Sequence, residues 1–356
     1  MQNMAHYIGK KISFISIEQS SRIYVAKALG IICVVVGHSG SPFADFIYLF
    51  HMPLFFFISG YLYQDHYTLK PVLLIKKRIK SLYIPFVKYG IIFLIFHNIF
   101  ARLHLYSDFQ LYTWKQYLRE FANIVTFGGT ETFLGIFWFI TSLFWVNILY
   151  CLLSHFIYRI CEPKKDRILF ITIVSIFLVG NVLSIYKLFL PRVFDITFVA
   201  LMFFYIGSSF RKHEYKIIYN PIICFSCFLF LITSTLYGSI SMVGRSYVSP
   251  AFILSNAMAG VYLTLYVSNI FKNSKCLNFV GENTLPILAF HFVSFKIVNV
   301  VQVYLYSYPN SMIGEHPIIH ENCKVWWIAY VTVGLFIPLL IASIGSKLSL
   351  YIKSVV

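Results

Sequence analysis

Apolar runs recur along the whole chain and are separated only by short polar breaks. A helix that crosses the hydrocarbon core of a bilayer needs about 20 mostly apolar residues, and about ten runs approach that length. Their approximate bounds are 23–42, 44–63, 82–101, 134–156, 167–186, 195–210, 217–237, 249–271, 283–305 and 325–346. The pattern predicts an all-α integral membrane protein with about ten transmembrane helices. It also predicts one membrane domain over residues 1–356, with no separate soluble domain.

The composition points to the same class of protein. The chain is 59% hydrophobic and 12% charged, whereas about a quarter of the residues of a soluble protein are charged. The first twenty residues lack an apolar core followed by a small-residue cleavage site, so the first span is expected to direct membrane insertion itself. The seven cysteines lie mostly within spans, which argues against a disulfide framework.

The net charge of +16 is explained by membrane topology. With a cytoplasmic N-terminus, 19 of the Lys and Arg residues fall on inside segments and 7 fall on outside segments. Positive charge concentrates on cytoplasmic loops, so both termini are predicted to be cytoplasmic. A role in binding nucleic acid is excluded, because no basic face with stacking aromatic residues stands clear of the membrane.

Two longer polar breaks are predicted to lie outside. The first, 102–133, contains LYTWKQYLREF, whose aromatic and charged positions predict a short amphipathic helix in the outer interface. The second, 307–324, contains His316 and His320. Pro317 separates these two histidines and no third ligand is evident, so no metal site is predicted.

Ionisable residues inside spans are costly and point by default to function. The first set comprises Lys27, His38, His51 and His291; the second comprises Lys88, His97 and Lys296. Lys27 and His38 are eleven residues apart, which puts them on one helix face about 16 Å apart. Two simpler explanations are that Lys27 extends to the inner interface and that His38 is wetted at the outer surface.

The stretch FHMPLFFFISGY places His51 in the outer half of the second span. The break between the first two spans is short, so they are expected to pack as antiparallel neighbours, with His51 at a depth close to that of His38. Pro53 removes a helical hydrogen bond, so a kink is predicted at His51. Two histidines at one depth suggest a site that accepts and returns protons. His291, which enters from the inside, is expected nearer the middle of the membrane.

A cluster of basic residues follows the second span. Its members are Lys76, Lys77, Arg78 and Lys80. They could form a positive-inside loop that touches anionic membrane lipid, or a binding site for a phosphorylated cofactor.

Six stretches of the chain resemble the acyltransferase 3 family of integral-membrane O-acyltransferases, and more narrowly its fucose 4-O-acetylase-like branch of bacterial sugar O-acetyltransferases. They are Ala26–Ser39, Phe50–Tyr61, Lys76–Phe86, Phe137–Trp145, Phe204–Lys212 and Gly281–His291. They fall in the family's order and cover most of the chain, and the second stretch is the most specific. The family places a basic residue, usually arginine, before a histidine with ten residues between them, and Lys27 and His38 match this pair. This branch commonly has an aspartate three residues before the basic residue, where this chain has Tyr24.

The resemblance implies acetyl-CoA as the donor, entering from the cytoplasm. It implies a hydroxyl of a cell-surface glycan as the acceptor (O-antigen, capsule or lipid-linked sugar) at the outer face of the bacterial inner membrane. Lys27, Lys76, Lys77, Arg78 and Lys80 would then bind the cofactor. His38 would act as the general base, directly or through an acetylated histidine, and His51 would position the substrate or share the proton.

His291 and Trp138 are expected on the acceptor side. Trp138 would stack on a sugar face, although it could instead anchor its helix at the membrane interface. The competing function is a transporter or flippase of a lipid-linked glycan, which would move its substrate without an acetyl donor. A glycan polymerase would more naturally carry a very large outside loop.

Overall fold

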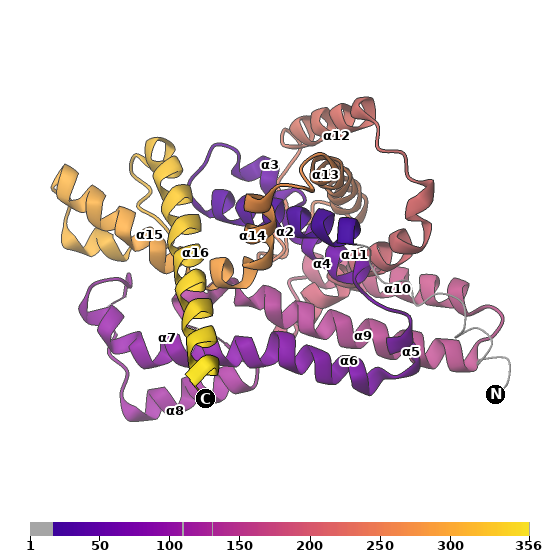
Figure 1. The fold of residues 1–356 in the computed structure, drawn as a ribbon, viewed down its shortest axis with the longest axis horizontal. Helices are drawn as coiled ribbons and strands as arrows, with labels where there is room; N and C mark the ends of the chain where they lie inside the picture. The colour runs from indigo at the N-terminus through magenta and orange to yellow at the C-terminus, as the bar shows by residue number, and fades with distance from the viewer. Residues whose placement is uncertain (1–16, 109, 130, 356) are drawn as a thin grey trace.

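The computed structural model describes residues 17–108, 110–129 and 131–355, without the side chains of residues 216 and 348–355 (Figure 1). The predicted cytoplasmic N-terminal segment, residues 1–16, lies outside the described part of the chain. The described residues contain no strand, which confirms the all-helical prediction.

The helices follow one another with short connections. They are α2 (Ile17–His38), α3 (Ala44–Tyr48), α4 (His51–Tyr61), α5 (His66–Leu69), α6 (Pro71–Arg78), α7 (Ile84–Arg102), α8 (Trp114–Val125), α9 (Trp138–Ile160), α10 (Lys165–Ile185), α11 (Phe194–His213), α12 (Pro221–Ser234), α13 (Pro250–Ile270), α14 (Lys275–Glu282), α15 (Thr284–Tyr306) and α16 (Cys323–Val355). A π-helical turn spans Ile79–Tyr83, and 3₁₀ turns span Thr132–Phe137, Pro191–Val193, Glu214–Lys216 and Asn310–Gly314.

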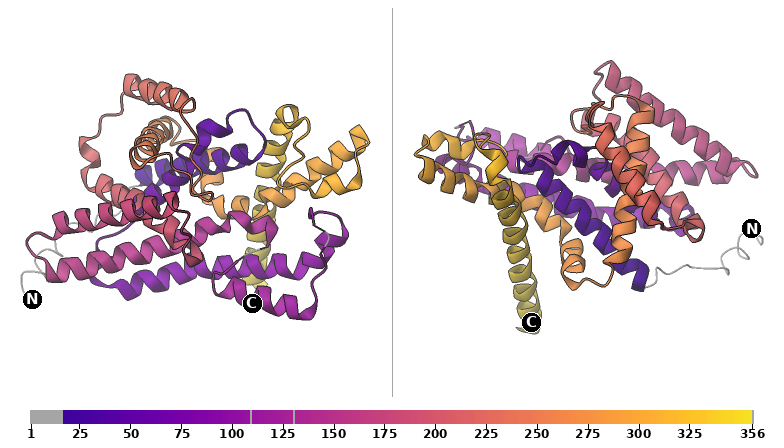
Figure 2. Two further views of the ribbon diagram at one scale, coloured as in Figure 1. Left: turned by 180° about the vertical axis from the view of Figure 1, so that it is seen from behind. Right: turned by 90° about the horizontal axis from the view of Figure 1, so that it is seen from above.

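Within the described residues, nine helical segments are long and apolar enough to cross a membrane. They coincide with nine of the ten predicted runs. The remaining run, 217–237, forms α12, which has 14 residues and is therefore shorter than the usual span. The end of α16 extends away from the other helices (Figure 2).

The basic cluster lies on helix rather than in a loop. Lys76, Lys77 and Arg78 end α6, and Lys80 lies in the π-helical turn that joins α6 to α7. Pro85 has no N–H to donate to the carbonyl of Ser81, which weakens regular α-helical bonding at this point. The Ile84 N–H instead bonds to the carbonyl of Ile79, which is five residues earlier.

The second predicted span is broken immediately before His51. The first part, α3, ends at Tyr48, and α4 begins at His51 after Phe50, whose φ of −144° and ψ of −20° are not helical. Pro53 is the third residue of α4, where a missing N–H costs little. The predicted kink at His51 is confirmed.

Glycines allow α4 and α11 to approach closely. A Cβ added at Gly60 would lie 1.9 Å from the Phe204 carbonyl oxygen, and one at Gly207 would lie 2.0 Å from that of Phe57. Small residues at crossings let membrane helices bring their backbones together. This contact fixes α4, and with it His51, against α11.

The predicted amphipathic helix is confirmed as α8. Its large residues Trp114, Leu118 and Phe121 are 74%, 52% and 45% exposed. An exposed apolar face with charged neighbours is typical of a helix that lies in the membrane interface.

Substituting Gly60 by alanine is expected to lower the free energy of unfolding by about 1–3 kcal/mol, because the added methyl group overlaps the backbone of α11. Thermal unfolding of the detergent-purified protein measures the effect. Gly345→Ala is the control, since a Cβ there meets nothing within 4 Å. Equal melting temperatures for the two variants would contradict the close crossing.

Candidate active site

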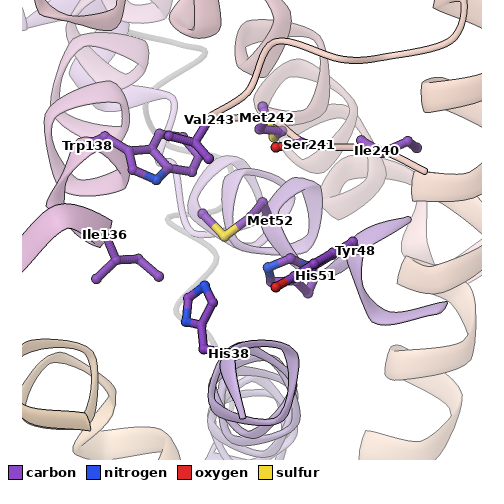
Figure 3. Close-up of a pocket in the computed structure, with 10 residues that line it drawn as sticks. All are labelled: His38, Tyr48, His51, Met52, Ile136, Trp138, Ile240, Ser241, Met242 and Val243. Atoms are coloured by element: carbon purple, nitrogen blue, oxygen red, sulfur yellow. The ribbon is translucent and has the colours of Figure 1, made fainter. Parts of the chain in front are cut away.

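A cavity of about 150 Å³ lies where α2 ends and α4 and α9 begin (Figure 3). It is lined by His38, Tyr48, His51, Met52, Ile136, Trp138, Ile240, Ser241, Met242 and Val243. The last four residues belong to the connection between α12 and α13. The structure therefore brings three of the predicted site residues, His38, His51 and Trp138, to one cavity.

The His38 ring is held by His291 of α15. His38 Nδ1 lies 3.2 Å from His291 Nε2, and the rings stack with centroids 5.4 Å apart. His291 Nδ1 lies 3.0 Å from the carbonyl oxygens of both Ile287 and Leu288. The expected position of His291 near mid-membrane is corrected, because this hydrogen bond places it beside His38.

These contacts determine which ring nitrogens carry protons. Carbonyl oxygens only accept hydrogen bonds, so His291 Nδ1 must donate, and in a neutral ring Nε2 is then an acceptor. His38 Nδ1 therefore donates to His291, which leaves His38 Nε2 without a proton. The ring of His38 points from the end of α2 toward the cavity (Figure 3).

His51 is held in the same way by backbone. Its Nδ1 donates to the carbonyl of Ile47, 3.0 Å away, at the end of α3. The helix break leaves this carbonyl available, and His51 Nε2 is then also unprotonated in the neutral ring. Tyr48 donates to the Gly37 carbonyl at 2.6 Å, which ties α3 to the end of α2. The cavity thus contains two imidazoles that can each accept a proton.

His316, from the connection between α15 and α16, completes the ring cluster. It contacts Phe292, whose ring also packs on His38, with centroid distances of 4.7 Å and 4.9 Å. Burial, together with the nearby positive charge of Lys296, lowers the pKa of His316 to about 4. Among the described residues, no group of three or more His, Cys, Asp or Glu side chains is placed to hold a metal.

The predicted cofactor-binding residues are divided by the structure. Lys27 is half-buried and lies within electrostatic range of Arg78, while Lys76 and Lys80 are exposed. Lys77 donates to the Tyr67 hydroxyl at 2.9 Å. The Arg78 Nε is buried without a hydrogen-bond partner in the described chain. Neither Lys27 nor Arg78 forms an ion pair with the described acidic residues, so together they form an uncompensated positive site.

Tyr24 takes the place of the aspartate that is common in the resembled branch. The Lys27 ammonium lies 5.3 Å from the centre of the Tyr24 ring. A cation–π contact of this kind orients an ammonium group without neutralising it. The charge of Lys27 therefore remains available to an anionic ligand.

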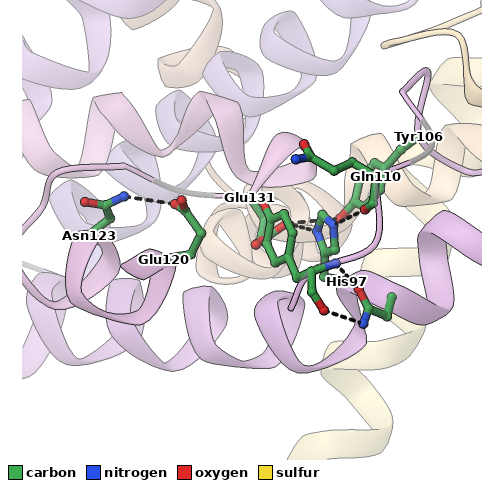
Figure 4. Close-up of polar contacts among 8 residues, drawn as sticks. His97, Tyr106, Gln110, Glu120, Asn123 and Glu131 are labelled. Atoms are coloured by element: carbon green, nitrogen blue, oxygen red, sulfur yellow. Dashed lines mark hydrogen bonds and ion pairs between the residues drawn. The ribbon is translucent and has the colours of Figure 1, made fainter. Parts of the chain in front are cut away.

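The second set of ionisable residues has structural roles. Lys88 is exposed, and Lys296 donates to the carbonyls of Gly314 and Glu315, which holds the outside segment after α15. His97 binds the Glu131 carboxylate at 2.7 Å through Nδ1 and the Gln110 carbonyl at 3.0 Å through Nε2 (Figure 4). Both of these partners are acceptors, so His97 donates from both nitrogens and is an imidazolium.

Comparison with known families gives one match. The model of the acyltransferase 3 family, described as an acyltransferase domain, matches residues 21–347. No curated protein matches the chain. No solved structure matches it either.

Replacing His97 by asparagine is expected to lower the free energy of unfolding by about 3–5 kcal/mol, because the buried Glu131 carboxylate loses its partner. Burial already raises the pKa of the Glu131 carboxyl against the opposing effect of His97. Without His97 the folded state favours the protonated acid. Stability is therefore greatest below the unfolded pKa and falls as the pH rises through the raised folded pKa.

Melting temperatures of the wild type and His97→Asn, measured across pH, test this expectation. Glu162→Gln is the control, because it breaks the Lys165–Glu162 pair, in which the glutamate is exposed. A His97→Asn defect that is smaller at high pH than at low pH would contradict the ion-pair assignment.

Proposed function

This chain belongs to the acyltransferase 3 family of membrane acyltransferases, and from that premise we propose that it is an O-acetyltransferase. The donor is acetyl-CoA, and the acceptor is a hydroxyl group of a cell-surface glycan at the outer face of the bacterial inner membrane. The observation that carries the proposal is the unprotonated Nε2 of His38, which is oriented by His291 beside a cavity that His51 and Trp138 share.

His38 acts as the general base. Its Nε2 accepts the proton of the acceptor hydroxyl while that oxygen forms a bond to the acetyl carbonyl carbon. As the carbon–sulfur bond breaks, His38 returns the proton to the departing CoA sulfur. His291 Nε2 accepts a hydrogen bond from His38 Nδ1 throughout, so it stabilises the imidazolium that forms.

His51 supplies a second base in the same cavity. In one-step transfer, its Nε2 accepts a hydrogen bond from the acceptor and orients the attacking hydroxyl. In two-step transfer, His38 becomes acetylated on Nε2, and His51 removes the proton from the acceptor that attacks this intermediate. The two unprotonated nitrogens suit both routes.

The positive site around Lys27 suits the donor. Acetyl-CoA carries phosphates at one end and its thioester at the end of a long arm. The uncompensated charges of Lys27 and Arg78, with Lys76, Lys77 and Lys80 beside them, favour the phosphates. The continuous helix α2 connects Lys27 to His38 over about 16 Å. Lys27 and His38 therefore mark the two ends of the proposed donor path.

Trp138 lies at the point where the acceptor must enter. It is half-buried and is the first residue of α9, and its ring lines the cavity beside His38. Aromatic rings offer a flat apolar surface to one face of a sugar. Trp138 would hold the acceptor ring while its hydroxyl faces His38.

His38→Ala is expected to reduce acetyl transfer from acetyl-CoA by about 10²–10⁴-fold, the usual loss when a general base is removed. Purified protein in lipid nanodiscs, with radiolabelled acetyl-CoA and candidate glycans, provides the measurement. The matched control is His213→Ala, since His213 is exposed and bonds only to the Ser209 carbonyl of its own helix. Full activity of His38→Ala would contradict the mechanism. Glycan movement without any acetyl donor would favour a transporter.

A further inference from the structure

A second cavity, of about 260 Å³, adjoins the proposed active site. It is lined by Phe86, Phe127, Gly128, Gly129, Gly135, Trp138, Thr141, Leu190, Arg192, Val193 and Arg245. Trp138 lines both cavities. A ligand on the Trp138 ring therefore contacts the catalytic cavity on one side and this second cavity on the other.

Two arginines supply the only charged side chains that line the second cavity. Arg245 donates through Nε to Asp195 Oδ2 at 2.6 Å and through Nη1 to the Val243 carbonyl at 2.9 Å. Arg192 is exposed and donates through Nε to the Thr126 carbonyl at 2.6 Å. Asp195 neutralises one of the two charges, so the cavity keeps a net positive charge. The amino groups of Arg192 have no acceptor among the described residues.

The surrounding backbone adds to this positive character. Arg192 and Val193 directly precede α11, whose unpaired N-terminal N–H groups favour a negative charge. Asp195, in the first turn of α11, already uses part of this effect through its pair with Arg245. The charge of Arg192 is the part that remains for a ligand.

Backbone strain is concentrated at this cavity. Nine non-glycine residues in the described chain have positive φ, and four of them line it: Phe127 (58°), Arg192 (54°), Val193 (55°) and Arg245 (52°). A left-handed conformation is an outlier for a β-branched residue such as Val193. Such strain persists only where the surrounding structure holds it, and it clusters at binding and catalytic sites. Here it sets the positions of both arginines.

Arg245 also connects the two cavities mechanically. The Val243 carbonyl that it binds belongs to a residue that lines the catalytic cavity. An anion that engages Arg245 therefore contacts the same connection, between α12 and α13, that covers His38 and His51.

We propose that the acceptor is an acidic glycan, whose carboxylate or phosphate oxygens bind Arg192 and Arg245 while its sugar ring lies on Trp138 with a hydroxyl toward His38. Arginine is suited to both anions, because its planar guanidinium offers two parallel donors to a pair of oxygens. This assignment rests on the proposed function, because it takes the cavity at His38 as the place of transfer.

The test measures binding rather than turnover. Wild-type protein in nanodiscs of uncharged phosphatidylcholine is titrated with methyl glucuronide, glucose 1-phosphate and neutral methyl glucoside. At least one anionic probe is expected to bind about tenfold more tightly than the neutral probe, as charge-assisted hydrogen bonds add about that much. A preference for glucuronide assigns the carboxylate as the recognised group, and a preference for glucose 1-phosphate assigns the phosphate.

Arg192→Gln is expected to abolish the preference, while Arg102→Gln, which removes another exposed arginine of a predicted outside segment, retains it. Arg245→Lys complements the test, because it preserves the charge opposite the buried Asp195. It is expected to weaken the preference without removing it. Equal binding of neutral and anionic probes by the wild type would overturn the proposal, and so would a full preference in Arg192→Gln.

The outcome is separable from that of the proposed function. His38→Ala should keep the anion preference and lose acetyl transfer. A retained preference in a protein that never transfers acetyl groups would reject the proposed function alone. Acetyl transfer to neutral and acidic acceptors with equal efficiency would reject the anionic acceptor alone.

Discussion

The hydrogen bond between His38 and His291 is the constraint on which the site depends. It joins two helices that are 253 residues apart in the chain, at a point where water is not available to supply hydrogen bonds. The carbonyls of Ile287 and Leu288 fix the proton of His291 on Nδ1, and this assignment passes through the hydrogen bond to His38. A helix backbone thus sets the proton position of a side chain on another helix, and the free nitrogen faces the cavity.

The same solution recurs wherever a polar group is buried in this protein. His51 is held by a carbonyl that a helix break makes available, Lys296 by carbonyls of the outside segment, and His97 by Glu131 and a carbonyl. Groups fixed on every polar atom act as structural ties. His38 and His51 differ because each keeps one nitrogen free, and both of these residues line the same cavity.

Much of this arrangement could be predicted from local features of the sequence. Run lengths predicted the helices, Pro53 predicted the break at His51, and the short connection after His38 predicted that the two histidines approach each other. The depth of His291 was wrong, because counting residues along a span assumes upright helices and cannot include their tilt. The basic cluster could be found but not divided, since exposure depends on which face of α6 packs inward.

Arg192 and Arg245 were missed because they served only in the count of outside charges. A signal was present, since few basic residues fall on outside segments and each of these follows an apolar or glycine-containing turn. Their approach to Trp138, however, depends on three connections that are distant in sequence.

The most direct test of the account is nitrogen-15 magnetic resonance of histidine-labelled protein in lipid, at a pH above the usual imidazole pKa of about 6.5. The His38 signals are assigned by their loss in His38→Ala. The account predicts a protonated Nδ1 and an unprotonated Nε2 for His38. A proton on Nε2 instead would mean that His291 does not orient the base, and it would contradict the proposed chemistry.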